Sequence, residues 1–319
     1  MSLKEQLSRV KKQFGDGALM CMGDSEHVPV EVISTGILSL DQAIGVGGVP
    51  RGRVIEFYGE EATGKTSLAM SVVAQAQKNG ELCAIVDAEH AIDRSHIVKL
   101  GVDPDKLYIS QPSCGEEGLE IAEALIKSGE IAVVVVDSVA ALVPRSELEG
   151  DFGDAQMGLQ ARLMSQAMRK LTGSVHTSNC CLIMINQVRS QLGIVYGSPI
   201  TTAGGKALKF YSGLRIQVSK AGTLKDGEEI IGARTRAKII KCKVAPPGKI
   251  AEFDLLYGSG FSRCGDLFDL AKQRGLVEGT GAWVTIYGER LQGRANAIAY
   301  LEENKEVADK LEAEIRKTL

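Results

Sequence analysis

One short segment, residues 59–66, constrains the fold of this chain more than any other. It reads Gly-Glu-Glu-Ala-Thr-Gly-Lys-Thr and lies between the apolar run Val54–Tyr58 and a helical pattern over Ser67–Lys78. This is GxxxxGK followed by Ser or Thr, in the strand–loop–helix context that the motif requires. Gly59 and Gly64 let the loop turn its N–H groups toward phosphate oxygens, and the following helix adds its positive N-terminal end. The segment therefore predicts that the chain binds a nucleoside triphosphate.

Two side chains of this segment supply the chemistry. Lys65 brings a compact positive charge to the β- and γ-phosphates, and the hydroxyl of Thr66 is a ligand for Mg²⁺. Asp137 follows the apolar run Ile131–Val136, so it ends a buried strand and would hold the same ion through water, although such a carboxylate is often only a helix cap. The residues of this segment predicted to contact nucleotide are Gly59, Glu60, Glu61, Ala62, Thr63, Gly64, Lys65, Thr66 and Ser67.

Polar residues also follow two other apolar runs. An Asp-Ala-Glu triplet ending at Glu89 comes after Leu82–Val86, and Glu89 is a candidate general base for the attacking water. A helix cap or a surface charge is the alternative. Gln187 comes just after Cys180–Ile185, where it could sense the γ-phosphate. The segment that follows, Val188–Thr202, is a loop of about fifteen residues, and loops of that length in compact domains are usually functional.

Beyond the phosphate loop, continuous aliphatic runs alternate with helical patterns. Such runs are typical of strands buried on both faces, and the helices between them indicate a parallel sheet covered on both sides. Helices are predicted over Glu116–Ser128 and Gln156–Leu171. Three later segments predict short antiparallel strands that extend the same sheet: Leu214–Val218, Arg236–Lys243 and Glu252–Leu256. The predicted fold class is α/β.

We expect three parts along the chain. Residues 1–30 hold a helix with an apolar stripe at Leu3, Leu7, Val10 and Phe14, followed by a linker rich in turn formers. That helix could dock on its own domain or on a neighbouring copy. Residues 31–262 form the nucleotide-binding core. Residues 263–319 form a small C-terminal α/β domain, which is predicted to end in a helix over Glu302–Leu319.

Composition excludes several classes of protein. The longest apolar run is interrupted by Asp137 and is far shorter than the roughly 20 residues of a membrane span. The 7 cysteines form no CxxC pair, and no secretory signal opens the chain, so a reducing cytoplasm is expected. The net charge is −3, which by itself does not suggest nucleic acid. Residues 206–249 are nevertheless rich in Lys and Arg, a stretch that could contact a polyanion or simply face solvent.

Motifs along almost the whole chain resemble, in order, those of the RecA family of bacterial homologous-recombination ATPases. The number of ordered motifs makes the resemblance specific. The segments that carry it besides the phosphate loop are 34–41, 47–53, Asp87–Asp93, Val135–Leu142, 157–159, Ser165–Leu171, Ile185–Arg189, Thr201–Gly205, Ala207–Tyr211 and Gly281–Trp283.

This resemblance implies a DNA-dependent ATPase that uses ATP and Mg²⁺. Such a protein forms helical filaments on single-stranded DNA and exchanges strands with homologous double-stranded DNA in recombinational repair. It implies that Glu89 activates water and that Gln187 couples nucleotide state to the DNA loop behind it. It also implies that Lys241 and Lys243 reach the γ-phosphate of a neighbouring protomer, across an interface at which Phe210 packs. A LexA-type repressor and recombination mediators are further expected partners.

The resemblance also assigns residues to DNA and to the base of the nucleotide. A second DNA loop is expected around residues 150–157, and Asp93 and His96 are expected at the nucleotide. The residues expected to contact DNA are Met157, Arg162, Ser165, Arg169, Arg189, Tyr196, Gly204, Gly205 and Lys206.

Some positions depart from the family pattern. Glu60, Ala62 and Thr63 replace a Pro and two Ser of the usual phosphate loop, whose backbone cradle does not need those side chains. His96 stands where an aromatic Tyr stacks on adenine, which leaves the nucleotide preference open. The sequence ends at Leu319 without the long acidic tail of well-known members, and both a bacterial and a viral source fit it.

Two other functions share the same ATPase core. A hexameric motor of the replicative helicase type would form closed rings instead of open filaments. A filament scaffold that binds ATP without turnover would not need Lys65, Glu89 and Asp137, so their presence together argues against it.

Overall fold

The structure is a computed structural model that describes residues 2–15, 18–19, 21, 29–151, 158–190, 200–279 and 282–317. The chain divides into two compact units, Met1–Glu31 and Val32–Leu319. In the first unit, the predicted helix is confirmed as α1 (Leu3–Phe14), which begins at a capping box formed by Ser2 and Glu5. The two ends of its apolar stripe are exposed, Leu3 at 71% and Phe14 at 68%, while Leu7 and Val10 are partly buried.

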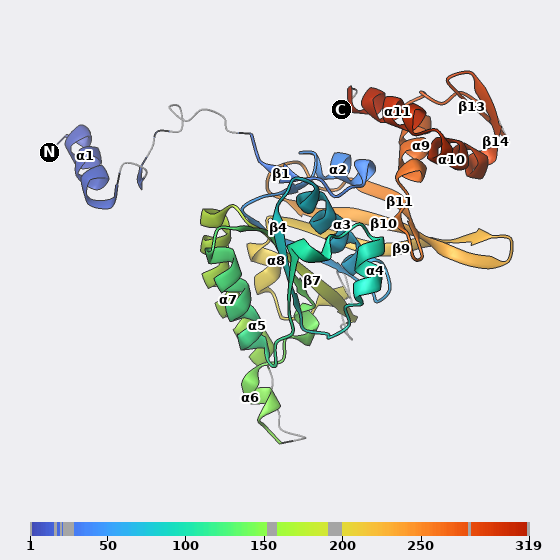
Figure 1. Cartoon of the computed structure of the whole chain (residues 1–319). Coiled ribbons are helices and arrows are strands. Elements are labelled where there is room, and N and C mark those ends of the chain that lie inside the picture. Colours follow the sequence, from blue (N-terminus) through green and yellow to red (C-terminus); the bar gives the residue numbers. More distant parts are fainter. Residues whose placement is uncertain are drawn as a thin grey trace. The chain divides into compact units, whose positions relative to one another are not determined.

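The second unit is organised around a ten-stranded sheet, so the predicted α/β fold class is confirmed (Figure 1). Its strand order is β12-β11-β10-β9-β3-β7-β6-β4-β5, with β8 paired to β7. The parallel part contains β3 (Arg53–Gly59), β7 (Cys181–Ser190), β6 (Ile131–Asp137), β4 (Leu82–Asp87) and β5 (Leu107–Ser110). The part that follows contains β9 (Leu214–Asp226), which is parallel to β3, and the antiparallel β10 (Glu229–Cys242), β11 (Ile250–Leu256) and β12 (Gly260–Phe261).

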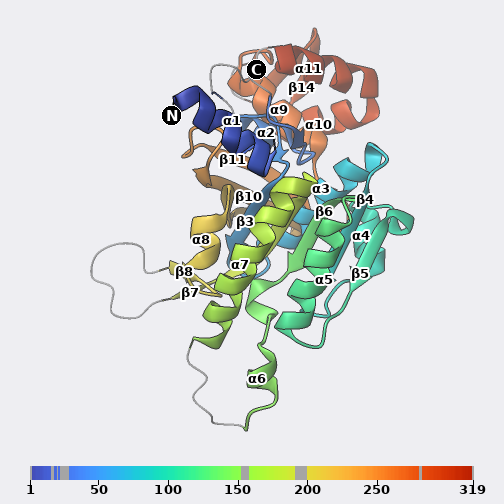
Figure 2. The ribbon, with the colours of Figure 1, turned by 90° about the vertical axis from the view of Figure 1, so that its left-hand side faces the viewer.

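Helices cover both faces of this sheet, as the continuous aliphatic strands predict. One face carries α2 (Leu38–Ile44), α3 (Lys65–Lys78) and α4 (Arg94–Lys99), whose apolar side chains join a core with the odd-numbered residues of β3. The other face carries α5 (Gly115–Lys127), α7 (Leu159–Ser178) and α8 (Ala207–Tyr211), which form a second core. Figure 2 shows α5 and α7 side by side over this face.

The core also contains several short elements. They are β1 (Val32–Ile33), β2 (Val49–Pro50), η3 (Pro104–Lys106), η4 (Val139–Ala141), α6 (Arg145–Leu148) and β8 (Ile200–Thr202). Of these, β1 and β2 form a separate two-stranded sheet.

Several predicted bounds differ from the observed ones. The strands predicted at Leu214–Val218 and Arg236–Lys243 are the inner ends of β9 and β10, which continue as a long hairpin (Figure 1). The outer part of that hairpin is mostly polar and exposed, with Ile230 and Ile231 as exposed apolar residues, so its sequence lacks the long apolar run that predicts a buried strand. The helix predicted over Gln156–Leu171 is observed over Leu159–Ser178. Its last two turns are mostly polar, with Val175 the buried residue among them, so they show little apolar periodicity.

The C-terminal segment has its own apolar core. It consists of α9 (Arg263–Gln273), the hairpin β13 (Trp283–Ile286) and β14 (Glu289–Gln292), α10 (Gly293–Glu303) and α11 (Lys305–Lys317). The predicted final helix over Glu302–Leu319 is therefore divided at Asn304, whose backbone N–H donates to Tyr300 O as α10 ends.

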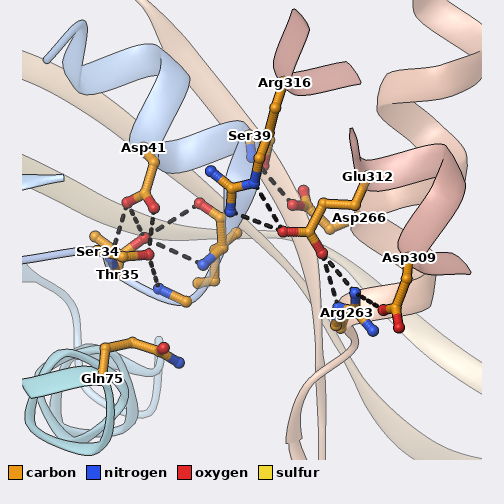
Figure 3. A network of polar contacts seen from close by, with 12 residues as sticks. Ser34, Thr35, Ser39, Asp41, Gln75, Arg263, Asp266, Asp309, Glu312 and Arg316 are labelled. Atoms are coloured by element: carbon orange, nitrogen blue, oxygen red, sulfur yellow. Dashed lines mark hydrogen bonds and ion pairs between the residues drawn. The ribbon is translucent and has the colours of Figure 1, made fainter. Parts of the chain in front are cut away.

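The helix α2 connects this C-terminal core to the nucleotide-binding half. Leu38 packs into the C-terminal core, and Ser39 N donates to the carboxylate of Asp266 at 3.0 Å (Figure 3). Asp41 of the same helix accepts from Thr35 N at 2.8 Å and from the Ser34 hydroxyl at 2.5 Å. Burial raises the pKa of Asp41 to about 6 despite these donors.

The turn that Asp41 organises rests directly on the helix that follows the phosphate loop. The Ser71 hydroxyl of α3 donates to Thr35 O at 2.6 Å. The C-terminal helices are joined to one another through Arg263, which contacts Asp309 and Glu312 (Figure 3). A continuous set of contacts therefore runs from the C-terminal core through α2 to α3.

Candidate nucleotide and DNA sites

The phosphate loop lies where β3 ends and α3 begins. Gly59 is required there by space, because a Cβ at this position would lie 1.9 Å from the carbonyl oxygen of Val218 on the adjacent β9. The helix α3 begins at Lys65, so its N-terminal N–H groups point toward the loop. A pocket of about 450 Å³ is lined by Ala62, Thr63, Gly64, Lys65, Thr66 and Ser67 together with His96 and residues 255–258.

The two reactive side chains of the loop are held in defined positions. Lys65 is 8% exposed, and its Nζ donates to Glu60 O at 2.6 Å. Burial lowers the pKa of Lys65, while the nearby charges of Asp137 and Glu89 oppose that shift. Thr66 Oγ1 donates to Asp137 Oδ2 at 2.7 Å, and burial raises the pKa of Asp137 to about 6. A hydroxyl and a carboxylate so placed beside a phosphate loop are the oxygen donors that Mg²⁺ prefers.

Glu89 and Gln187, which follow different strands, meet beside this loop. Gln187 Nε2 donates to Glu89 Oε1 at 3.1 Å, and the Ser138 hydroxyl donates to the same oxygen. The sequence reasoning did not single out Ser138, although it directly follows Asp137 at the end of β6. The strand order places β6 next to both β4 and β7, and this adjacency brings the three residues together.

The base end of the pocket is formed by segments far apart in sequence. His96, on α4, lines it as expected. Asp93 is the N-cap of α4, where its side chain accepts from Ser95 N at 2.8 Å. Tyr257, which follows β11, lines the same pocket and is 59% exposed. No motif marked Tyr257, because its approach to His96 depends on the antiparallel end of the sheet.

The candidate DNA residues gather around α7. Arg162 and Arg169 are exposed on this helix, while the Ser165 hydroxyl donates to Ala161 O at 2.8 Å. Gly204 and Gly205 both have left-handed φ, +75° and +78°, and an added Cβ would lie within 2.9 Å of α7 side chains. The glycine turn therefore packs closely on α7.

A second pocket, of about 340 Å³, adjoins this turn. Arg189, Gly204 and Gly205 line it together with Gly158 and Gln160. Lys206 is exposed at the start of α8. Met157, Tyr196 and most of the two loops that hold them lie outside the described residues.

Lys241, Lys243 and Phe210 form a separate group. Pairing places Glu56 of β3 beside Arg215 of β9, and Arg215 beside Lys241 of β10. Lys241 is therefore level with Glu56, three residues before the phosphate loop begins at Gly59, and two strands away from it. Its Nζ donates to Lys209 O at 2.9 Å and to Phe210 O at 2.8 Å. Lys243 is exposed, and Phe210 is 67% exposed.

Comparison with known proteins agrees with this geometry. The family model for the RecA N-terminal domain matches residues 1–262, and the model for the RecA C-terminal domain matches residues 265–319. The chain belongs to the RecA family. The resemblance inferred from its motifs is confirmed.

Individual RecA proteins match over nearly all of the chain. Protein RecA of Mannheimia haemolytica is 52% identical over 319 residues, which cover 100% of this chain and 87% of that protein. Protein RecA of Geobacter sulfurreducens is 54% identical over 311 residues, or 97% and 92%. The crystal structure of the RadB recombinase matches with a TM-score of 0.55 and 25% identity, covering 72% of this chain and 98% of that one.

These matches establish the general activity. As a RecA-family protein, the chain is a DNA-dependent ATPase and recombinase that acts in homologous recombination and DNA repair. It binds nucleotide and DNA and assembles with its own copies into filaments. Within the part of the chain that the structure describes, no helix is long and apolar enough to cross a membrane.

Proposed function

We propose that this chain hydrolyses ATP with Mg²⁺ at the pocket around the phosphate loop, with Glu89 as the general base. The observation that carries the proposal is the hydrogen bond from Gln187 Nε2 to Glu89 Oε1, because it joins the candidate general base to the residue immediately before the DNA-loop segment. Chemistry at the base and the state of that segment can then influence each other directly.

The phosphate end of the site works by position and charge. Lys65 turns from Glu60 O to the β- and γ-phosphates, and the N–H groups of the loop and of α3 hold their oxygens. Thr66 and Asp137 would hold Mg²⁺, the latter through water, and the bound ion would supply positive charge beside the phosphate oxygens. Glu89 takes a proton from the attacking water, and no covalent intermediate is needed.

The base of the nucleotide lies between His96 and Tyr257. Both line the pocket, and imidazole and phenol rings each stack on a purine. Asp93 contributes by capping α4, which holds His96 in place. Stacking alone reads the shape of a purine but not its edge, so ATP is preferred over other purine nucleotides only weakly at this end.

Single-stranded DNA binds along α7 and the glycine turn. Arg162, Arg169, Arg189 and Lys206 contact the phosphates, and Gly204 and Gly205 let the backbone approach closely. Ser165, Met157 and Tyr196 are the other residues proposed to contact DNA. Homologous double-stranded DNA is the second substrate. Backbone contacts of this kind tolerate any base sequence and weaken with salt.

A neighbouring protomer completes the site. The side chains of Lys241 and Lys243 extend toward the adjacent protomer and stabilise the negative charge on its γ-phosphate, while Phe210 packs at the interface. The amphipathic helix α1, in residues 1–30, binds a neighbouring copy through its apolar stripe; residues 31–262 form the ATPase core and residues 263–319 a small domain. A LexA-type repressor and recombination mediators bind the assembled filament, and the 7 free cysteines fit a reducing cytoplasm.

Phosphate release with and without single-stranded DNA tests this proposal. Turnover is expected to require Mg²⁺ and to rise strongly with DNA, and Lys65→Ala is expected to lose it by weakening nucleotide binding. If DNA binds but the rate of ATP hydrolysis does not change, the DNA surface does not act through the Gln187–Glu89 contact, and the proposal is wrong.

A further inference from the structure

The middle of the sheet contains a buried charged cluster that the proposed reaction does not use. It consists of Glu56 on β3, Asn186 on β7 and Arg215 on β9, which are 0%, 0% and 5% exposed. Removing two charges from water costs much of what their attraction returns, so a buried ion pair contributes little net stability. The cluster therefore needs an explanation other than stability alone.

One carboxylate oxygen of Glu56 is hydrogen-bonded to Asn186, which connects the two ends of the DNA-loop segment. Glu56 Oε1 accepts from Asn186 Nδ2 at 3.0 Å, and the same nitrogen donates to Ala203 O at 3.1 Å. Asn186 Oδ1 accepts from Gln187 N at 2.9 Å. The carboxamide of Asn186 thus joins the residue before the glycine turn to the backbone of Gln187, and Glu56 fixes its orientation.

The other carboxylate oxygen of Glu56 binds Arg215, which is the cross-strand neighbour of Lys241. Glu56 Oε2 accepts from Arg215 Nε, and the Arg215 guanidinium lies over the Tyr58 ring, 4.6 Å from its centroid. Arg215 pairs directly with Lys241 across the two antiparallel strands. Like charges that face each other in this way repel, and the carboxylate of Glu56 compensates for that repulsion.

We propose that Glu56 is a positioning residue that links the two ends of the catalytic apparatus. It holds Gln187 in the chain's own nucleotide site through Asn186, and it holds Lys241 for the neighbour's site through Arg215. This inference rests on the proposed function, in which Lys241 acts on the next protomer. Through Glu56, a change at the DNA loop reaches both the site on the same chain and the lysine that serves the adjacent one.

Glu56→Gln tests the link because it is isosteric but uncharged. The amide offers one oxygen for two donors, so Asn186 and Arg215 can no longer both be held as they are. Arg215 also faces Lys241 without a counter-charge. We expect both functions of the cluster to weaken.

A mixing experiment measures the two functions separately. Lys65→Ala supplies the donated lysines but lacks a working phosphate loop, and Lys241→Ala/Lys243→Ala supplies the reverse. In an equal mixture, about a quarter of the head-to-tail interfaces combine both intact halves, so ATPase activity returns on mixing. Glu56→Gln is then added to one partner at a time. We expect a loss of about tenfold in restored kcat with either partner, and an unchanged KM for ATP.

Arg215→Lys and Glu81→Gln are the matched variants. Arg215→Lys keeps a buried cation beside Glu56 but loses the fixed geometry of the guanidinium, so it should lower restored activity only in the lysine-donating partner. Glu81→Gln breaks another ion pair, to Arg51 at 2.6 Å, and should leave restored activity within about twofold. Thermal unfolding and co-filament formation are measured for every variant. If Glu56→Gln does not fold, Arg215→Lys carries the test.

Three results would overturn the inference. The first is a loss with Glu56→Gln in one partner only, or in neither. The second is an equal loss with Arg215→Lys in both partners, which would mean that the cluster acts through general stability. The third is a parent mixture that stays inactive although filaments co-assemble. That last result is the failure of lysine donation itself, and it is recognised because it occurs before Glu56 is changed.

Discussion

The phosphate-loop edge of the sheet and the face around Lys241 differ in how far one chain completes them. At the loop, the functional side chains already have partners within the chain: Lys65 donates to Glu60 O, Thr66 donates to Asp137, and Gln187 donates to Glu89. On the other side, Lys241 Nζ donates to two carbonyl oxygens near the end of α8, beside an exposed Phe210. The first region is assembled by strand order within one chain. In the proposed function, the second presents its lysines to the nucleotide of another copy.

The difference explains how catalysis can depend on assembly. If one chain completed the site, turnover would not need assembly; in the proposed function, the site has Lys65 but needs Lys241 and Lys243 from a neighbouring copy. The Glu56–Arg215 ion pair lies between the two regions and is the contact proposed to couple them.

The largest expected effect lies in the self-contained region. Glu89→Gln should retain ATP and DNA binding and lose about 10²–10⁴-fold in turnover, since removing a general base typically costs that much. Single-turnover phosphate release with saturating DNA measures it, and Glu120→Gln, an exposed carboxylate on α5, is the control. Near-normal turnover would mean that another group takes the proton.

The next effect lies in the donated region. Lys241→Ala/Lys243→Ala should lower DNA-stimulated turnover by about 10²–10³-fold, as for the loss of preorganised positive groups at developing charge. ATP affinity should remain, because the phosphate loop is unchanged. Nucleotide binding by fluorescence and ATPase activity are measured on the same preparations. If affinity falls in proportion to turnover, these lysines act on the ground state in their own chain.

The two regions also differ in how well sequence predicts them. Asp137 directly follows an apolar run, Glu89 follows one after two residues, and Lys65 and Thr66 belong to the phosphate-loop motif that follows another. Their position at one sheet edge could therefore be inferred from local pattern. Tyr257 could not, because it reaches the pocket only after β9, β10 and β11 have paired in order.

The buried ion pair was equally hidden from sequence. Glu56 appeared only as one residue of an apolar run, and Arg215 as one basic residue among many. Their contact depends on the parallel pairing of β3 with β9, between segments 159 positions apart. The long outer part of the β9–β10 hairpin was missed for a related reason, since exposed strands lack an apolar pattern.

A third prediction concerns stability in the self-contained half. The pKa of Asp41 is raised by burial from 3.8 to about 6, so the folded chain holds a proton at pH values where the unfolded chain has released it. The contribution of Asp41 to stability is therefore complete below about pH 4 and is lost as pH rises through about 6. Between pH 7.5 and pH 4.5, the free energy of unfolding should rise by about 2 kcal/mol more in the wild type than in Asp41→Asn.

Urea unfolding of both proteins at the two pH values measures this difference. The Asn variant loses hydrogen bonds at every pH, but that loss cancels when each protein is compared with itself. Parallel pH profiles would mean that Asp41 is ionised in the folded chain, held by the hydroxyl and N–H donors of Ser34 and Thr35.

The smallest expected effect concerns the DNA surface along α7, where DNA binding is proposed to start the signal to both regions. Arg169→Ala should weaken binding of single-stranded DNA about fivefold, on the order of 1 kcal/mol, and by the same factor for every base sequence. The slope of log affinity against log salt should fall by about 0.7, as for one phosphate contact on a single strand.

Lys170→Ala is the matched control: it removes the same charge from the adjacent position of α7, but Lys170 faces the groove toward α5. Fluorescence anisotropy with two oligonucleotides of different sequence, at several salt concentrations, measures both quantities. An equal effect of the two variants would mean that α7 attracts DNA only through its overall charge. A sequence-dependent effect would place Arg169 at a base instead of at a phosphate. Either result would mean that α7 is not the surface that binds the DNA backbone and transmits DNA binding to Gln187.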